Sequence, residues 1–185
     1  MKIIDTPIEG LKVFEPRVFG DSRGYFMETW NSEALKKAGF PMNFVQDNES
    51  QSSKGTLRGL HFQKEHPQGK LVRVIQGEVF DVAVDLRPDS ATFGQWYGHT
   101  LSAENKHQMW VPEGFGHAYY TISEKAVFVY KCTDYYFADD QYSLSWEDPD
   151  LAIDWPIEEG VEVTLSANDK DAKSLKEIAE LLGKR

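Results

Sequence analysis

Short runs of β-favouring residues, separated by glycine, proline and asparagine, recur along most of the chain. Runs rich in valine, isoleucine and aromatic residues favour strands, and the residues between them favour turns. Strands are expected at residues 11–19, 25–30, 44–48, 56–63, 70–76, 78–86, 95–101, 108–111, 118–122, 126–133 and 143–146. About ten strands with little helix predict an all-β sandwich or barrel, for which a jelly roll is the most natural form.

Two of these strand segments contain a residue that shapes their pairing. Pro16 lies inside segment 11–19 and cannot donate a ladder hydrogen bond, so that segment is expected to be an edge strand or to contain a bulge. Gly77 separates segments 70–76 and 78–86, and this spacing predicts a tight hairpin between them.

Two short helices are expected beside the strands. Residues 31–39 begin with capping residues and end at Gly39, which predicts one helix. Apolar residues spaced i, i+3, i+4 and i+7 predict an amphipathic helix at about 171–182. No repeat, low-complexity tract or linker divides the chain, so residues 1–185 are expected to form a single domain.

Composition excludes several classes of protein. The 185 residues are 41% hydrophobic, which is too apolar for a disordered chain. A formal net charge of -10 argues against nucleic-acid binding, which needs basic surface to neutralise phosphates. Ten acidic residues and no lysine or arginine lie between Asp134 and Glu162, and this stretch is expected to be mostly a solvated flank.

Cysteine usage and hydropathy bear on location. Cys132 is the single cysteine, so no intramolecular disulfide can form. The N-terminus lacks the apolar core of a signal peptide, and no apolar run approaches the roughly 20 residues that span a bilayer. The chain is therefore expected to be cytoplasmic, with neither a membrane nor a nucleic acid as partner.

His61 is the first candidate for chemistry. A histidine in a half-buried strand can be a general base, a ligand or, more often, a packed core residue. Arg58 lies three positions earlier, so a regular strand would point the two side chains to opposite faces. Both can face one cavity only if the strand bulges or bends, and Gly59 is the residue that permits this.

Lys70 and Tyr130 are further candidates on strands. A lysine that begins an apolar strand is more often an exposed edge residue than a cation that meets a carbonyl oxygen or a phosphate. Tyr130 shares one strand face with Phe128 and Cys132. A tyrosine on such a face is more often a core residue than a general acid.

The remaining candidates lie in polar segments. Residues 112–117 contain two glycines and a proline, and are expected to form a loop that ends at His117. Asp169 is either a surface or near-cap acid, or a carboxylate that orients a histidine. His61 and His66 do not have a metal-ligand spacing, and no glycine-rich phosphate loop is present. Neither a metal nor a cofactor is expected.

Nine segments in one order carry a family resemblance. They are FGDSRGYFME at residues 19–28, VQDN at 45–48, LRGLHFQ at 57–63, QGKLVR at 68–73, GEVFDVAVD at 77–85, TFGQW at 92–96, LSAEN at 101–105, PEGF at 112–115 and YKCTDYY at 130–136. Together the segments closely resemble the dTDP-4-dehydrorhamnose 3,5-epimerase family, whose members have a cupin-type jelly roll and take part in dTDP-L-rhamnose synthesis.

The resemblance implies roles for individual residues. His61 would be the general base, Asp169 the carboxylate that orients it, and Tyr130 the general acid on the opposite face of the sugar. Lys70 would stabilise the enolate oxygen. The residues implied to bind the sugar nucleotide are Arg23, Glu28, Gln46, Asp47, Asn48, Arg58, Lys70, His117 and Tyr136, the last by stacking on thymine.

The resemblance also implies a reaction and an assembly. The reaction is inversion of C3 and C5 of dTDP-4-dehydro-6-deoxy-D-glucose without a cofactor, through an enolate next to the C4 ketone. The assembly is a homodimer in which the segment from Arg23 to Glu28 serves the neighbouring subunit's site. Arg23 and Arg58 lie in the nearly neutral first half of the chain, so a locally positive cleft is expected on this acidic protein.

Three departures from the family pattern leave alternatives open. Residues 116–119 read Gly-His-Ala-Tyr where the family often has Ala-His-Gly-Phe, Asn168 replaces a common lysine, and Gln141 replaces a common acid. One alternative is a 3-epimerase that acts on a dTDP-4-keto-6-deoxysugar of another pathway. A second is a non-catalytic cupin that binds a sugar nucleotide, and the least favoured is a metal-dependent cupin.

Overall fold

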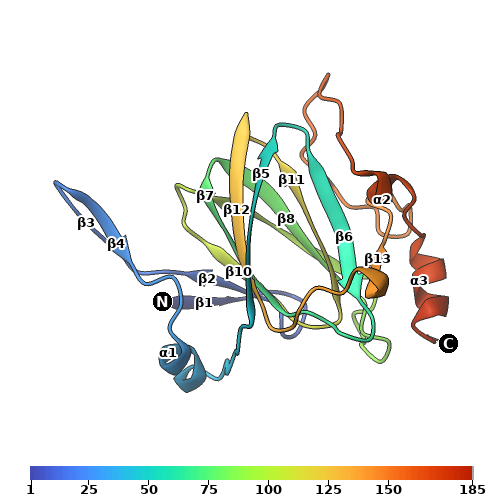
Figure 1. Cartoon of the computed structure of the whole chain (residues 1–185), viewed down its shortest axis with the longest axis horizontal. Helices are drawn as coiled ribbons and strands as arrows, with labels where there is room; N and C mark the ends of the chain where they lie inside the picture. The colour runs from blue at the N-terminus through green and yellow to red at the C-terminus, as the bar shows by residue number, and fades with distance from the viewer. Residues whose placement is uncertain (185) are drawn as a thin grey trace.

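The computed structural model describes residues 1–184, and two antiparallel sheets make up its body (Figure 1). The first sheet runs in the order β1 (Lys2–Asp5), β2 (Lys12–Glu15), β10 (Gln108–Val111), β7 (Lys70–Gln76), β12 (Lys125–Cys132) and β5 (Gln46–Ser53). The second runs in the order β13 (Gln141–Ser143), β6 (Leu57–Gln63), β11 (Phe115–Thr121), β8 (Glu78–Asp85) and β9 (Trp96–Ser102). The prediction of an all-β jelly roll is confirmed.

The main core lies between the two sheets because side chains alternate along each strand. Val72 and Val74 of β7 point inward with Phe128 of β12, and none is more than 3% exposed. Arg73, between the two valines, lies on the opposite face of β7 and is half-buried. Full burial of one such aliphatic or aromatic side chain contributes about 1.5–3 kcal/mol, so the inward faces of these strands hold the sandwich together.

A separate hairpin leaves the body of the sandwich. It consists of β3 (Val18–Asp21) and β4 (Gly24–Met27), and it extends away from both sheets (Figure 1). α1 (Ser32–Lys37) follows the hairpin, and the side chain of Asn31 accepts a hydrogen bond from the N–H of Ala34, which confirms the helix expected here. Leu35 anchors α1 in a cluster with residues of β2 and β7.

Several strand boundaries differ from those expected. Pro16 ends β2, and β2 lies between β1 and β10, so the expected edge strand over residues 11–19 is wrong. β1 was not expected. β5 starts later than segment 44–48 and continues through a polar sequence, because β12 supplies its backbone partners along its whole length. A strand at the edge of a sheet needs no apolar run when only one face packs on the core.

The hairpin expected at Gly77 is also wrong. β7 and β8 do not pair with each other, because Gly77 carries the chain from the first sheet to the second. Gly77 has a positive φ of 76°, and a Cβ at this position would lie 2.1 Å from the carbonyl oxygen of Lys125. A glycine is required here for the change of sheet, where the pattern of residues indicated a turn within one sheet.

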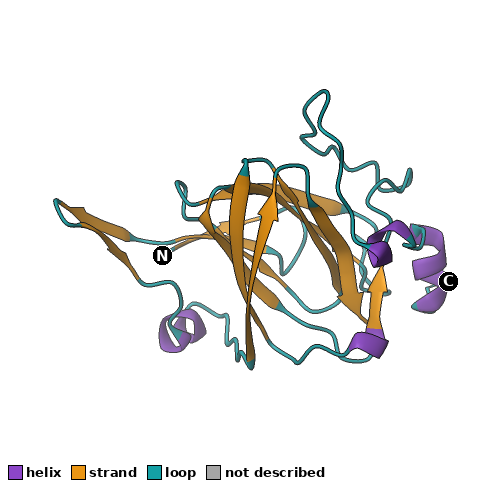
Figure 2. Cartoon of the chain, turned by 45° about the horizontal axis from the view of Figure 1, so that its top comes forward, coloured by secondary structure: helices purple, strands orange, loops and turns teal. Residues whose placement is uncertain are grey.

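The C-terminal region covers the outer face of the second sheet (Figure 2). It contains the 3₁₀ turn η1 (Ala138–Asp140), α2 (Ala167–Lys170) and α3 (Leu175–Leu181). α3 is shorter than the expected 171–182, because Ser174 and Glu177 form a capping box that sets its start. Ile178 is fully buried against the second sheet. Within residues 1–184, no helix has the length and hydropathy needed to cross a membrane.

Candidate active site

A cavity of 560 Å³ opens between the two sheets and collects several of the expected site residues. Strands β5, β6 and β12 and the segment before α2 supply its walls. The candidates that line it are Arg58, His61, Tyr130 and Asp169. Most other lining side chains carry hydroxyl groups, and the only carboxylate among the lining residues is that of Asp169. A lining rich in carboxylates would have contradicted the expected positive cleft, and this lining is not rich in carboxylates.

Asp169 reaches the cavity because the segment before α2 lies beside the start of β6. Thr164 exchanges backbone hydrogen bonds with Gly55 and Leu57, and the hydroxyl of Ser166 caps α2 and donates to Oδ2 of Asp169. Oδ1 of Asp169 lies 2.5 Å from Nε2 of His61, and the carboxyl side chain is 1% exposed. The interpretation of Asp169 as a surface acid is therefore wrong.

The environment of Asp169 keeps its carboxyl ionised. Burial alone would raise the pKa of Asp169, but hydrogen bonds from His61, from Ser166 and from the backbone of Gly59 lower it below its ordinary value. An ionised carboxylate only accepts hydrogen bonds, so Nε2 of His61 carries the proton and Nδ1 keeps a free lone pair. This arrangement leaves a nitrogen that can take up a proton.

Gly59 lies at the strand irregularity that is expected if Arg58 and His61 face one cavity. The register between β6 and β11 shifts between His117 and Tyr119, opposite Gly59, which has a positive φ of 111°. A Cβ at this glycine would lie 2.3 Å from the carbonyl oxygen of His117. The shift brings Arg58 and His61 to one cavity, as expected for a bulged strand.

Tyr130 lies on β12, in the sheet opposite that of His61. Burial raises the pKa of Tyr130 to about 12, and the nearby Cys132 and Tyr119 contribute to the rise. A phenol with so high a pKa stays protonated near neutral pH and can donate its proton. The two proton-transfer candidates thus come from opposite walls of the cavity.

Arg58 is held by a small network that the sequence did not reveal. Its Nε donates to Oγ of Ser52 over 3.0 Å, and the hydroxyl of Tyr119 lies 3.1 Å from the same oxygen and 2.9 Å from Oγ of Ser50. The ring of Tyr119 stacks on Phe128 with centroids 4.2 Å apart. Tyr119 stands where the family often has phenylalanine, so this hydroxyl is a feature of the present chain.

His117 and Lys70 are not among the lining residues of the cavity; His117 is buried, and Lys70 is partly buried. His117 belongs to β11, so the loop expected over 112–117 ends earlier, and its Nε2 lies 2.9 Å from Oδ1 of the fully buried Asp81. Asp81 is an acid among the apolar residues of β8, and this placement is the one sequence signal for the pair. Lys70, at the start of β7, lies opposite Cys132 in the strand register with β12, and burial lowers the pKa of Lys70.

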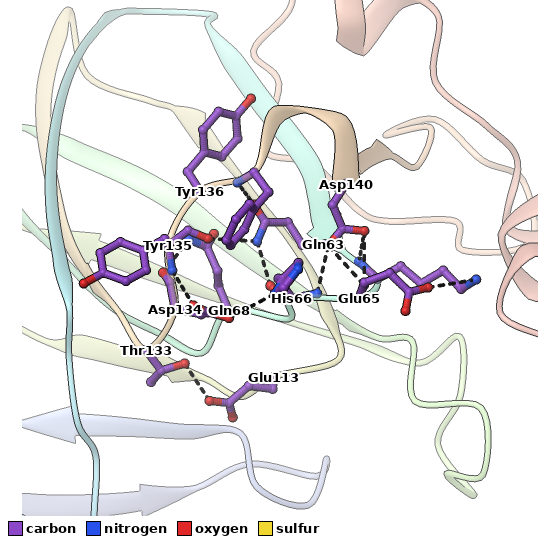
Figure 3. A network of polar contacts seen from close by, with 12 residues as sticks. Gln63, Glu65, His66, Gln68, Glu113, Thr133, Asp134, Tyr135, Tyr136 and Asp140 are labelled. Atoms are coloured by element: carbon purple, nitrogen blue, oxygen red, sulfur yellow. Dashed lines mark hydrogen bonds and ion pairs between the residues drawn. The ribbon is translucent and has the colours of Figure 1, made fainter.

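The other expected binding residues occupy one edge of the first sheet and the loop beside it. Nε2 of Gln46 donates to Oδ1 of Asn48, and Oε1 of Gln46 accepts from the N–H of Tyr136, whose ring is exposed. Asp47 is exposed and forms an ion pair with Lys131. Figure 3 shows the loop with Tyr136 and the polar contacts that hold it.

Arg23 and Glu28 do not reach the cavity of their own chain. Arg23 lies on the extended hairpin, 88% exposed, and forms an ion pair with Asp21 at 2.6 Å. Glu28 follows β4 and accepts a hydrogen bond from Asn31. The hairpin also exposes four hydrophobic side chains, Val18, Phe19, Tyr25 and Phe26.

The acidic stretch is less uniform than expected. Asp140 is buried and accepts backbone hydrogen bonds from residues 64–66, and Asp148 is buried and accepts from the N–H of Leu175. These two acids cap backbone groups, so the expectation of a mostly solvated flank fails for them. Within residues 1–184, no three His, Cys, Asp or Glu side chains cluster as metal ligands do.

A jelly roll whose cavity joins a histidine–carboxylate pair to a tyrosine on the facing wall is typical of a cupin-type enzyme that transfers protons. The family model for dTDP-4-dehydrorhamnose 3,5-epimerase matches residues 5–177. The chain belongs to this epimerase family.

Individual relatives agree with this assignment. A dTDP-4-dehydrorhamnose 3,5-epimerase of Pseudomonas aeruginosa is 52% identical over 175 residues, which cover 94% of this chain and 96% of the relative. The crystal structure of dTDP-6-deoxy-D-glucose-3,5-epimerase from Legionella pneumophila, in complex with dTDP-4-keto-L-rhamnose, is 52% identical with a TM-score of 0.93, covering 98% of this chain and 96% of that one. A 3′-monoepimerase from Streptomyces bikiniensis, in complex with dTDP-quinovose, is 34% identical with a TM-score of 0.89, covering 97% and 90%.

Proposed function

We propose that the protein inverts C3 and C5 of dTDP-4-dehydro-6-deoxy-D-glucose to give dTDP-4-dehydro-L-rhamnose, a step of dTDP-L-rhamnose synthesis. The observation that carries the proposal is the placement of His61 and Tyr130 on opposite walls of one cavity. Inversion needs a base on one face of the sugar and an acid on the other. The higher identity of the 3,5-epimerases favours this reaction over inversion at C3 alone.

The first step is removal of a proton from the carbon next to the C4 ketone. Nδ1 of His61 takes this proton, while Asp169 holds the Nε2 proton and stabilises the imidazolium that forms. The C–H electron pair moves into the C4 carbonyl and gives an enolate. A positioned general base of this kind contributes typically about 10²–10⁴-fold to the rate.

The enolate oxygen then needs a positive charge close to it. Lys70 lies opposite Cys132 and Tyr130 lies opposite Val72 in the register of β7 and β12, so the side chains of Lys70 and Tyr130 share one face of the first sheet. In our proposal the ammonium of Lys70 stabilises the enolate oxygen, because a fixed cation in a site shielded from water is far more effective than one in bulk solvent.

Reprotonation from the other face completes the inversion. The hydroxyl of Tyr130 donates its proton to the carbon, the electron pair of the enolate returns to that carbon, and the C4 ketone forms again. Tyr130 regains a proton from solvent and His61 releases the one it took up. The reaction is redox-neutral and needs no cofactor.

Binding of the sugar nucleotide falls to residues other than the proton-transfer pair, of which only Arg58 lines the cavity. We propose Arg58 and His117 as binding groups on the second sheet, with Gln46, Asp47 and Asn48 on β5 and Tyr136 against the thymine ring. Arg23 and Glu28 would act in the site of a second copy, because the hairpin carries them away from their own cavity. The protein would then be a homodimer, and we place it in the cytoplasm.

Proton NMR of the purified protein with dTDP-4-dehydro-6-deoxy-D-glucose in heavy water tests the proposal. Deuterium should enter at both C3 and C5, and His61→Ala should abolish the exchange while the nucleotide still binds. Deuterium at C3 but never at C5 would refute the 3,5-epimerase in favour of a 3-epimerase. No exchange in the wild type would favour a binding protein.

A further inference from the structure

The carboxamide of Gln63 uses all of its main hydrogen-bonding directions inside the protein. Its Nε2 donates to the carbonyl oxygens of His66 at 2.6 Å and Tyr135 at 3.1 Å, and its Oε1 accepts from the N–H of Phe137 at 2.7 Å. The residue is 5% exposed. All three partners are backbone groups, and they belong to the two loops that Figure 3 shows side by side.

These contacts fix a short aromatic loop, defined here as residues 135–137. Gln63 holds the backbone of Tyr135 and Phe137, and Gln46 accepts from the N–H of Tyr136 at 3.1 Å. Three consecutive backbone positions are therefore held by two glutamine side chains. The second loop is fixed in turn, because Asp140 accepts the N–H groups of residues 64–66.

The ring of Tyr136 has little packing of its own, since the residue is 51% exposed. Its direction therefore depends on the backbone of the aromatic loop. His66 adds to this support, because its ring stacks on Phe137 with centroids 4.1 Å apart. The contact would be lost if Phe137 moved.

We propose that Gln63 is a positioning residue for nucleotide recognition, which holds the aromatic loop so that Tyr136 meets the base. The inference rests on the proposed function. Gln63 is not among the lining residues of the cavity, so it acts through the loop and not on the sugar. Only an amide supplies two donors and one acceptor from one side chain, which is why a glutamine is required at this position.

Two substitutions of Gln63 and one of Tyr136 test the inference by titration of the full-length protein with dTDP. Gln63→Met, of similar shape but without the hydrogen bonds, should raise the Kd for dTDP about tenfold, as expected for loss of one base–aromatic stack. The KM for the sugar nucleotide should rise similarly, with kcat at saturation within about twofold of the wild type. Gln63→Glu keeps the acceptor for the N–H of Phe137 but loses both donors, so it should also weaken the binding of dTDP. This variant tests the inference if Gln63→Met does not fold.

A double variant separates positioning from a general loss of structure. Tyr136→Ala should weaken the binding of dTDP by the same factor. Adding Gln63→Met to Tyr136→Ala should cause no further loss of affinity, because both changes remove the same stacking interaction. The matched control is Asn105→Leu. The carboxamide of Asn105 also holds a loop, because it donates to the carbonyl of Thr100 and accepts from the N–H groups of Ser102 and His107. None of these hydrogen bonds involves residues 135–137 or a residue proposed to bind the nucleotide, so the variant should keep the wild-type Kd.

Two results would overturn the inference: an unchanged Kd in the Gln63 variants, or additive losses in the double variant. Binding of dTDP is measured without turnover, so it does not depend on the reaction. A wild type that binds dTDP but exchanges no sugar protons would count against the proposed epimerisation, and the Gln63 variants would still decide the positioning role.

Discussion

His61 and Asp169 are separated by 108 residues in the sequence, yet Nε2 of one and Oδ1 of the other lie 2.5 Å apart. The imidazole is partly exposed to the cavity, whereas the carboxyl is almost wholly shielded. The pair thus joins an imidazole that is accessible from the cavity to a carboxyl that is shielded from solvent. The carboxyl fixes the tautomer of the ring, and the second ring nitrogen remains available for proton transfer.

Asp169→Asn should retain the fold and lose most of the activity. An asparagine can present its amide N–H to Nε2, which forces the proton of His61 onto Nδ1 and removes the lone pair that acts as the base. We expect the rate of deuterium exchange to fall about 100-fold or more, with dTDP binding kept. Asp148→Asn changes a buried acid that caps α3, so it should lower stability without this loss. Full exchange in Asp169→Asn would refute the assigned role.

The activity should fall on the alkaline side through Lys70. Burial lowers the pKa of Lys70 from the ordinary 10.5, and nearby Cys132 and Asp81 offset only part of the effect. As pH rises through that lowered value, the enolate loses its cation, while Tyr130, with a pKa of about 12, still holds its proton. A profile of kcat between pH 7 and 11 measures this decline.

Lys70→Arg identifies the group responsible for that decline. A guanidinium stays charged throughout the range, so the variant should lose the alkaline decline even if its kcat is lower. Lys125→Arg, at the exposed start of β12, should leave the profile unchanged. An alkaline decline that persists in Lys70→Arg would show that another group titrates.

Mixing two inactive variants tests whether sites are shared between subunits. Arg23→Ala damages the hairpin of one chain, and His61→Ala damages the cavity of the other. If the hairpin serves its neighbour, a mixed dimer contains one complete site, so random exchange should restore about one quarter of the wild-type activity. Mixtures that stay inactive after subunit exchange would place Arg23 in its own chain's site, and an active Arg23→Ala would place it outside any site.

Asp85 should make the free energy of unfolding depend on pH in the acid range. Burial alone would raise the pKa of Asp85, but hydrogen bonds from Arg87, Ser90 and Thr92 lower it to about 2. Because the folded pKa lies below the unfolded one, the stabilisation is complete above about pH 5 and is lost as pH falls through 2. Asp85→Asn should lower the free energy of unfolding by about 2 kcal/mol at pH 7 and by about half of that at pH 3.

Urea unfolding at the two pH values measures the effect. Asp154→Asn, an exposed acid in the same protein, is the control and should change the free energy of unfolding little at either pH. An equal loss at pH 7 and pH 3 for Asp85→Asn would mean that the ionised carboxylate is not the source of the stability.

Strands that are rich in apolar residues and bounded by glycine or proline could be predicted from the sequence. Segments 70–76 and 108–111 match β7 and β10 at both ends. β5 could not be placed, because its residues are polar and its stability comes from backbone pairing with β12. The role of Gly77 was also out of reach, because a tight turn and a change of sheet place the same demand on a glycine.

Some features of the candidate site could likewise be predicted from the sequence, and others could not. The spacing of Arg58 and His61 predicted a bend at Gly59 on the condition that both side chains face one cavity. The partners of Asp169 and His117 come from distant parts of the chain, so neither contact has a local signature. Family resemblance supplied the roles, but it did not reveal the hydroxyl network of Tyr119.

Asp169 lies in α2, which follows every strand of both sheets in the chain, and this order bears on folding during synthesis. A ribosome has synthesised every strand of both sheets before this carboxylate appears. The strands of a nascent chain can begin to fold before α2 is made, but in our proposal they lack the carboxylate that sets the tautomer of His61. A variant that stops before α2 would therefore keep every strand of both sheets and still be inactive.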